Sequence, residues 1–108
     1  MPHPRFKILR STDDQYYFNL TARNAEILLA SERYSSRSGA VGGVEAVKTN
    51  APHDERYERL PSGKQFYFVL KARNGEVIGT SEMYSSRDAR ENGIGAVKEN
   101  AGVAEIEE

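Results

Sequence analysis

A polar motif that occurs twice is the most site-like feature of the sequence. It reads Ser-Glu-x-Tyr-Ser-Ser-Arg at residues 31–37 and again at residues 81–87. A tyrosine ring can serve as a platform for a ligand, while an arginine and the amide groups at a helix start attract anions. These residue types point to a symmetric polar site for a small anionic ligand. The candidate residues are Glu32, Tyr34, Ser35, Arg37, Glu82, Tyr84, Ser85 and Arg87.

The same motif also suits a purely structural role, which we consider the better interpretation. In that role the tyrosine packs beneath its own loop, a serine caps the helix that follows, and the glutamate accepts hydrogen bonds from loop amides. Repetition does not separate the two interpretations, because a duplication copies scaffold and binding site alike.

A second candidate surface is a strand face that alternates aromatic and basic side chains. Tyr17, Tyr67, Lys71 and Arg73 fall on one face of two predicted hairpins. Aromatic rings interleaved with cations are typical of platforms that bind single-stranded nucleic acid. This pattern defines the alternative function, a single-stranded nucleic-acid binder.

The distribution of charge opposes a binding mode led by phosphate groups. The chain has a net charge of −1, and residues 1–54 carry +1 while residues 55–108 carry −2. Across the hairpin turns, Arg23 is expected to pair with Glu26, and Arg73 with Glu76. We therefore expect a solvated sheet face first and a nucleic-acid platform second.

Catalysis and metal binding find little support in the residue types. The chain has no cysteine, and its two histidines, His3 and His53, stand beside prolines without a patterned carboxylate that would complete a metal site. The serines have neither a Gly-x-Ser-x-Gly turn nor a base partner. An enzyme would need Glu32 or Glu82 buried in a cleft. We expect a non-catalytic protein without metal or cofactor.

No segment indicates a membrane protein or a secreted one. No apolar run approaches the ~20 residues that a membrane helix requires. Residues 1–5 do not begin the apolar segment of a signal peptide. The expectation is a cytoplasmic protein that makes no membrane contact.

The elements that position these residues come from an internal duplication. Residues 16–51 align with residues 66–101 without a gap, and 19 of the 36 positions are identical. Each copy predicts three strands, at 6–10, 16–23 and 26–31 and again at 57–60, 66–73 and 76–81, then a helix. Residues 103–107 predict a last strand. Because one such unit buries little surface alone, we expect a single domain, 1–108, made of repeats at about 5–54 and 55–108.

The turn between the second and third strands sets which face each side chain occupies. Asn74-Gly75 is typical of a type I′ turn, which needs a positive φ at both residues. In that register Ala22 pairs with Ile27 in the first copy. Ile27 is then predicted to face the core and Leu28 the polar side.

Three details of the helices are also predicted. Ser85 followed by an acidic residue three positions later has the spacing of a capping box. Gly43 and Gly93 share one mid-helix position, which suggests that each helix backbone lies close to the sheet. Asn50 and Asn100 suit helix ends in the left-handed conformation.

Motifs that occur in order along the second copy, with weaker versions in the first, resemble a known family. They read Ala-Arg-Asn-Gly-Glu-Val-Ile at 72–78, Thr-Ser-Glu-Met-Tyr-Ser-Ser at 80–86 and Asn-Gly-Ile-Gly-Ala-Val-Lys-Glu-Asn-Ala at 92–101. The family is the YegP-like family of small bacterial proteins of unknown function, and the resemblance covers nearly the whole chain. It implies an α+β fold of two tandem β3-α repeats.

The resemblance further implies how the repeats assemble. They would form one antiparallel sheet with both helices on one face, and the strand after each helix would be exchanged between the repeats. A chain with two repeats would then be a self-sufficient monomer. The family supplies no activity, so we expect a non-catalytic binding or interaction module. Its partner would be a protein or a small anionic ligand, bound at the Tyr-Ser-Ser-Arg loops or on the open sheet face, and a small enzyme is the third hypothesis.

Overall fold

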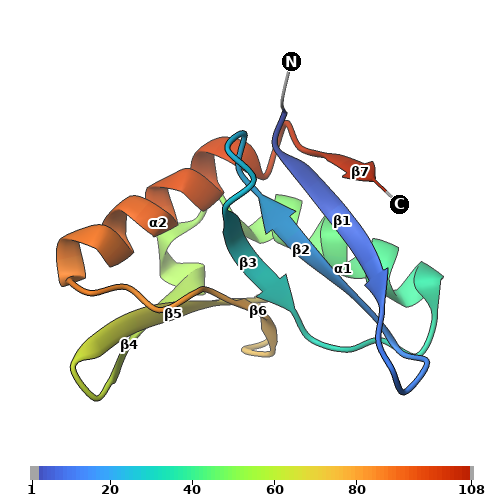
Figure 1. The fold of residues 1–108 in the computed structure, drawn as a ribbon, viewed down its shortest axis with the longest axis horizontal. Coiled ribbons are helices and arrows are strands. Elements are labelled where there is room, and N and C mark those ends of the chain that lie inside the picture. The colour runs from blue at the N-terminus through green and yellow to red at the C-terminus, as the bar shows by residue number, and fades with distance from the viewer. Residues whose placement is uncertain (1–2, 108) are drawn as a thin grey trace.

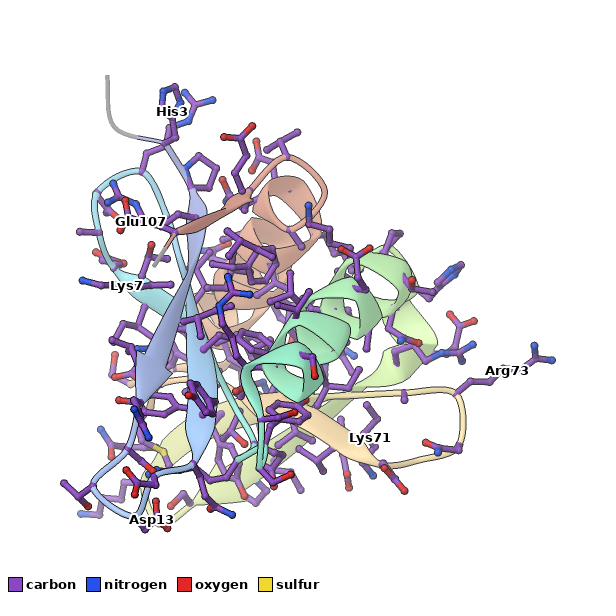
Figure 2. The ribbon with its side chains drawn as sticks, turned by 90° about the vertical axis from the view of Figure 1, so that its right-hand side faces the viewer. His3, Lys7, Asp13, Lys71, Arg73 and Glu107 are labelled. Carbon is purple, nitrogen blue, oxygen red and sulfur yellow. The ribbon has the colours of Figure 1, made fainter. Side chains whose placement is uncertain are left out.

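Seven strands among residues 3–107 form one sheet, and both helices of this part of the chain cover the same face of it (Figures 1 and 2). The computed structural model describes residues 3–107. The elements are β1 (Arg5–Arg10), β2 (Tyr16–Thr21), β3 (Ile27–Ser31), α1 (Arg37–Asn50), the 3₁₀ turn η1 (Asp54–Arg56), β4 (Tyr57–Ser62), β5 (Gln65–Lys71), β6 (Val77–Thr80), α2 (Arg87–Asn100) and β7 (Glu105–Glu107). The predicted α+β fold is confirmed.

The order of the strands relates the two repeats by an approximate twofold axis. The sheet runs β4-β5-β6-β3-β2-β1-β7, so the repeats meet where β3 pairs with β6. There Ala30 pairs with Thr80, the residue fifty positions later, and the axis passes through this pair. After α1 the chain enters β4 beside β5, and after α2 it enters β7 beside β1. The predicted exchange of strands between repeats is confirmed.

The last strand departs from the antiparallel prediction. β7 runs parallel to β1, pairing Phe6 with Ile106, while the other pairings are antiparallel. The chain leaves α2 at the far edge of the first repeat and can reach the outer side of β1 only in the direction of that strand (Figure 1). Residues 101–103 belong to the turn after α2, so the strand is shorter than predicted.

The core lies between the sheet and the two helices. Alternate strand residues bury their side chains completely against apolar positions of the helices, as the alternation predicted. The largest fully buried side chains are Phe6, Phe18, Leu20, Leu29, Phe68 and Leu70 of the sheet with Val44, Val47, Ile94 and Val97 of the helices. Phe6 and Phe18 meet edge to face, with ring centroids 5.7 Å apart.

The hairpin turns differ from the predicted type I′. Gly75 has a positive φ of 89° and Ala25 one of 69°, but the residue before each does not. The amide of Gly75 donates to the carbonyl of Ala72 and the amide of Ala72 to that of Glu76. This is a type I turn followed by a bulge residue in the left-handed region.

The extra residue in this turn shifts the register of the hairpin by one. Next to the turn Ile27 pairs with Thr21, not with Ala22 as predicted, and the ladder then skips Leu28 to pair Leu20 with Leu29. Leu28 is 5% exposed and belongs to the core, whereas Ile27 is 37% exposed. The predicted faces of these two residues were wrong because alternation fails across a bulge.

The helix ends also differ from the predicted ones. The caps are Ser36 and Ser86, each of which accepts a hydrogen bond from the amide three residues later, at 3.0 Å. They stand one residue after the predicted position, so Ser85 is not the cap. Asn50 remains in the right-handed helix, and its side-chain amide donates to the carbonyl of Ala46 at 2.8 Å. The predicted left-handed ends at Asn50 and Asn100 are therefore wrong.

Candidate functional site

Each Tyr-Ser-Ser loop is tied to the strand beside it by main-chain and serine hydrogen bonds. Tyr34 and Tyr16 exchange two backbone hydrogen bonds of 2.7 Å. The hydroxyl of Ser31 accepts from the amide of Phe18 and donates to the carbonyl of Glu32, both at 2.8 Å. The second copy repeats these bonds around Ser81. The repeated Ser-Glu pair therefore fixes the path of the loop.

The tyrosine of each loop packs against its own helix. The Tyr34 ring stacks on Phe18, with centroids 6.4 Å apart, and it also lies over Gly43. A Cβ atom on Gly43 would stand 2.7 Å from Cζ of Tyr34 and 2.9 Å from Phe18. Burial raises the pKa of Tyr34, and the nearby charge of Glu32 adds to this. The mid-helix glycine thus makes room for a tyrosine, not for the sheet backbone as predicted.

The second copy uses the same arrangement. Tyr84 stacks on Phe68 with centroids 6.3 Å apart, and a Cβ atom on Gly93 would stand 2.6 Å from Cζ of Tyr84. Burial is again the main cause that raises the pKa of this tyrosine. Arg87 lies over the ring of Phe66, 5.4 Å from its centroid. The tyrosines are parts of the packing in both repeats.

The eight predicted residues do not come together in one place. Because β3 and β6 are antiparallel, the loops that follow them leave the sheet in opposite directions, one toward α1 and the other toward α2 (Figure 1). Glu32, Ser35, Arg37, Glu82, Ser85 and Arg87 are exposed, and Tyr34 and Tyr84 are half-buried. The geometry gives two separate loops, so a single symmetric site does not form. Ligand binding at either loop stays a prediction.

The face of the sheet without helices carries a continuous row of side chains across all seven strands. Directly paired residues share a face, and the pairings link Glu58, Val69, Thr80, Ala30, Asn19, Lys7 and Glu107 in that order. The centre of the row is small or apolar and its ends are charged. Tyr17 and Tyr67 flank it, opposite Leu9 and Leu60.

Three cations at this face have partners within the chain, whereas the side chain of Lys7 has none among residues 3–107. Lys71 forms an ion pair with Glu58 at 2.5 Å, and Arg5 forms one with Glu107 at 3.1 Å. Arg33 lies over the Tyr17 ring, 4.8 Å from its centroid. These contacts leave a nearly neutral, partly aromatic surface.

Arg73 lies in the turn of the β5–β6 hairpin, whereas Tyr17, Tyr67 and Lys71 lie in strands of the sheet. It projects from the tip of the β5–β6 hairpin, far from Lys7 on the open face (Figure 2). Among residues 3–107, Arg73 has no hydrogen bond or ion pair with another side chain, so the predicted pair with Glu76 does not form. The side-chain oxygen of Asn74 instead accepts a hydrogen bond from the backbone amide of Glu76 at 3.0 Å. The equivalent pair of Arg23 with Glu26 is absent from the described residues as well.

An ion-pair network that sequence reasoning missed joins the start of β4 to α2. Asp54 accepts hydrogen bonds from Lys98 at 2.9 Å and from Arg59 at 3.0 Å. Arg59 also bonds Glu91 at 2.8 Å. Lys98 first, then Arg59, lower the pKa of the Asp54 carboxyl to about 2. Pairing with Arg59 also lowers the pKa of Glu91. The network is structural, because its charges satisfy one another.

Two clefts lie where the end of one repeat's helix faces the hairpin turn of the other repeat. The first, of about 640 Å³, is lined by Thr49, Asn50, His53, Arg56, Ala72, Arg73 and Asn74. The second, of about 470 Å³, is lined by Ala22, Arg23, Asn24, Glu99, Asn100 and Val103. A third cleft, of about 760 Å³, borders β1 and β7. Sequence reasoning missed the first two, because they exist only once the repeats exchange positions.

The described residues offer neither a metal-binding cluster nor a membrane-spanning helix. Within residues 3–107 no group of three or more His, Asp or Glu side chains is arranged to hold a metal ion. In that part of the chain no helix is both long and apolar enough to cross a membrane.

Comparison with known proteins places both repeats in one family. The family described as "Domain of unknown function (DUF1508)" matches residues 11–58 and 62–108. A UPF0339 protein of Bordetella pertussis is 51% identical over 53 residues, which is 49% of this chain and 48% of that protein. The UPF0339 protein YegP of Escherichia coli is 45% identical over 54 residues, 50% of this chain and 49% of that protein. These sequence matches span about half the length of each curated relative.

Solved structures extend the similarity to nearly the whole chain. The solution structure of Escherichia coli YegP, a protein of unknown function, has a TM-score of 0.91 at 39% identity and covers 99% of this chain and 93% of that one. A UPF0339 protein of Shewanella oneidensis has a TM-score of 0.90 at 44% identity, covering 96% and 89%. The resemblance inferred from the repeated motifs is confirmed. This chain belongs to the DUF1508 family of YegP-like proteins, whose function is unknown.

Proposed function

We propose that this protein is a non-catalytic interaction module that docks a protein partner on the helix-free face of the sheet. One observation carries the proposal: two helices cover one face of a seven-stranded sheet, while the other face presents half-buried aromatic and aliphatic side chains to solvent. Tyr17, Tyr67, Leu9 and Leu60 form its apolar part. Met83, at the position equivalent to Arg33, is 48% exposed.

The charges of this face favour a protein over a nucleic acid. A phosphate backbone requires several unpaired cations along one track. Here Lys71 and Arg5 are each held by a carboxylate, and Arg73 lies on the hairpin tip beyond the face. Neutral surfaces with tyrosine and methionine and few free charges are typical of the centres of protein interfaces.

The arrangement of the carboxylates favours binding over catalysis. A general acid or base is usually held in a cleft, where burial adjusts its pKa. Glu32 and Glu82 are exposed, lie on separate loops, and line none of the three clefts described above. The most strongly paired carboxylate, Asp54, is bound by two cations of the structural network.

Affinity capture from a bacterial lysate with matched variants tests the proposal. Tyr17→Ser/Tyr67→Ser removes the rings of the open face, and Val103→Ser is the control, because Val103 is 67% exposed but lies beside the end of α2. We expect wild type and control to retain the same protein after nuclease treatment and the double variant to lose it. Capture unaffected by the double variant, or RNA or DNA released by nuclease and by rising salt, would overturn the proposal.

A further inference from the structure

The two inter-repeat clefts have the same architecture but differ in charge. In each, an asparagine at a helix end faces the Ala-Arg-Asn turn of the other repeat. His53 and Arg56 of the first cleft correspond to Val103 and Ile106, fifty residues later, and Thr49 corresponds to Glu99. The first cleft therefore has two arginines and a histidine, whereas the second has one arginine opposed by a glutamate.

The guanidinium of Arg56 is held in place at the first cleft. Asn50 is only 7% exposed, and its side-chain N–H donates a hydrogen bond to the carbonyl of Ala46. Its side-chain oxygen accepts a hydrogen bond from Nε of Arg56 at 2.9 Å. The Arg56 side chain is 22% exposed, and its one ion pair, to the exposed Glu55, is long at 3.9 Å. The N–H groups on its two terminal nitrogens have no hydrogen-bond acceptor among residues 3–107.

Arg73 and Asn74 complete the donors from the other repeat. Arg73 is exposed and has no side-chain partner among residues 3–107. Asn74 uses its oxygen to accept the amide of Glu76, which leaves its side-chain amide group free to donate. The cleft thus offers donors from both repeats, and among residues 3–107 its two arginine charges are opposed only by the long ion pair between Arg56 and Glu55.

The end of α1 does not cancel this positive charge. A helix C-terminus has a partial negative charge on its unbonded carbonyls. The carbonyl of Asn50 accepts the amide of His53 at 3.0 Å, and that of Ala51 accepts the hydroxyl of Tyr57 at 2.7 Å. With these carbonyls occupied, the two guanidinium groups determine the charge of the cleft.

We propose that the cleft formed by His53, Arg56 and Arg73 binds the phosphate group of a small phosphorylated molecule. Guanidinium groups match the oxygens of phosphate in a bidentate manner. Two arginines attract a phosphate ester with two negative charges more strongly than a carboxylate with one. The volume of about 640 Å³ lies within the range of small-molecule sites and leaves room for the rest of the ester. This site is distinct from the open sheet face.

A titration with inorganic phosphate, followed by NMR at constant ionic strength, tests the site. We expect shifts of the backbone amides of residues 49–51, 53–56 and 72–75 to saturate, with acetate at least about tenfold weaker. Arg73→Ala should weaken phosphate binding at least about tenfold, since bonds to charged groups contribute on that scale. The matched Arg23→Ala, at the equivalent position of the second cleft, should leave the affinity unchanged.

A second variant gives the first cleft the residue that the second repeat has at the position equivalent to Arg56. Arg56→Ile copies the residue at position 106, and it should abolish saturable shifts while the spectrum of the β2–β3 hairpin stays unchanged, which shows that the fold persists. The proposal would be overturned if Arg23→Ala and Arg73→Ala lost binding equally, or if acetate bound as tightly as phosphate. Shifts that spread over both clefts without saturation would also overturn it.

Discussion

The mid-helix glycines give a sharp test of how the tyrosine loops pack. Gly93 and Gly95 stand in the same helix, and alanine should improve the intrinsic helix propensity at either position by about 1 kcal/mol. Their surroundings differ. A Cβ atom on Gly95 would meet nothing within 4 Å, whereas one on Gly93 would stand 2.6 Å from Cζ of Tyr84.

The magnitude follows from these two distances. Gly95→Ala should raise the free energy of unfolding by about 1 kcal/mol. Gly93→Ala gains the same helix propensity but forces Tyr84 off Phe68, and overpacking of this kind costs about 1–3 kcal/mol. The two variants should therefore differ by about 1–3 kcal/mol, and each kcal/mol corresponds to a shift of about 4–8 °C in a domain near this size.

Urea denaturation of both variants, followed by circular dichroism, measures the difference. In a Tyr84→Ala background the ring is gone, so Gly93→Ala should become stabilising by about 1 kcal/mol. If Gly93→Ala were as stable as Gly95→Ala in the wild-type background, the tyrosine would not occupy the space over the helix. The reasoning about both repeats would then be refuted.

Three further predictions concern the turns, the helix caps and the ion-pair network. Ala25→Gly should stabilise the protein by about 1 kcal/mol, because position 25 has a φ of 69° that glycine adopts more easily than alanine. Gly75→Ala should destabilise it by a similar amount in urea denaturation. Equal stability of the two variants would contradict the turn assignment. Ser36→Ala should lower the free energy of unfolding by about 1 kcal/mol, while Ser35→Ala should change it little. The reverse order would show that the cap lies one residue earlier, at the position predicted from the sequence. The carboxyl of Asp54, with a pKa of about 2 in the folded state, stabilises the protein above its unfolded pKa near 4 and loses that effect as the pH falls toward 2. Asp54→Asn should therefore flatten the decline of the urea midpoint between pH 4 and pH 2, and an unchanged decline would show that the network is unimportant.

The fold could be predicted because the duplication repeats every local signal. Two copies of the aromatic strand and of the serine before each helix make the element order plain, and the alternation around Phe18 and Phe68 identifies the core face. The resemblance to a known family supplied the exchange of strands, which local patterns do not encode. The faces of Ile27 and Leu28 were wrong because a single bulge reverses alternation.

The functional surfaces were harder to predict because they depend on tertiary placement. The Tyr34 motif has the residue types of an anion site, yet its ring fills space above Gly43, a contact between segments that sequence spacing does not show. Arg73 was grouped with Tyr17 by strand alternation, but the hairpin turn places it at the cleft that Arg56 also lines. The difference between the two clefts becomes visible only when position 56 is compared with position 106.

A protein partner on the helix-free face of the sheet can be detected by site-specific photo-crosslinking in bacterial cells. A photoreactive phenylalanine analogue would replace Tyr67 on the open face or, as the control, Glu45, which is exposed on α1. We expect one discrete protein adduct from position 67 that position 45 does not give. The same adducts from both positions, or nucleic acid alone linked to position 67, would contradict it.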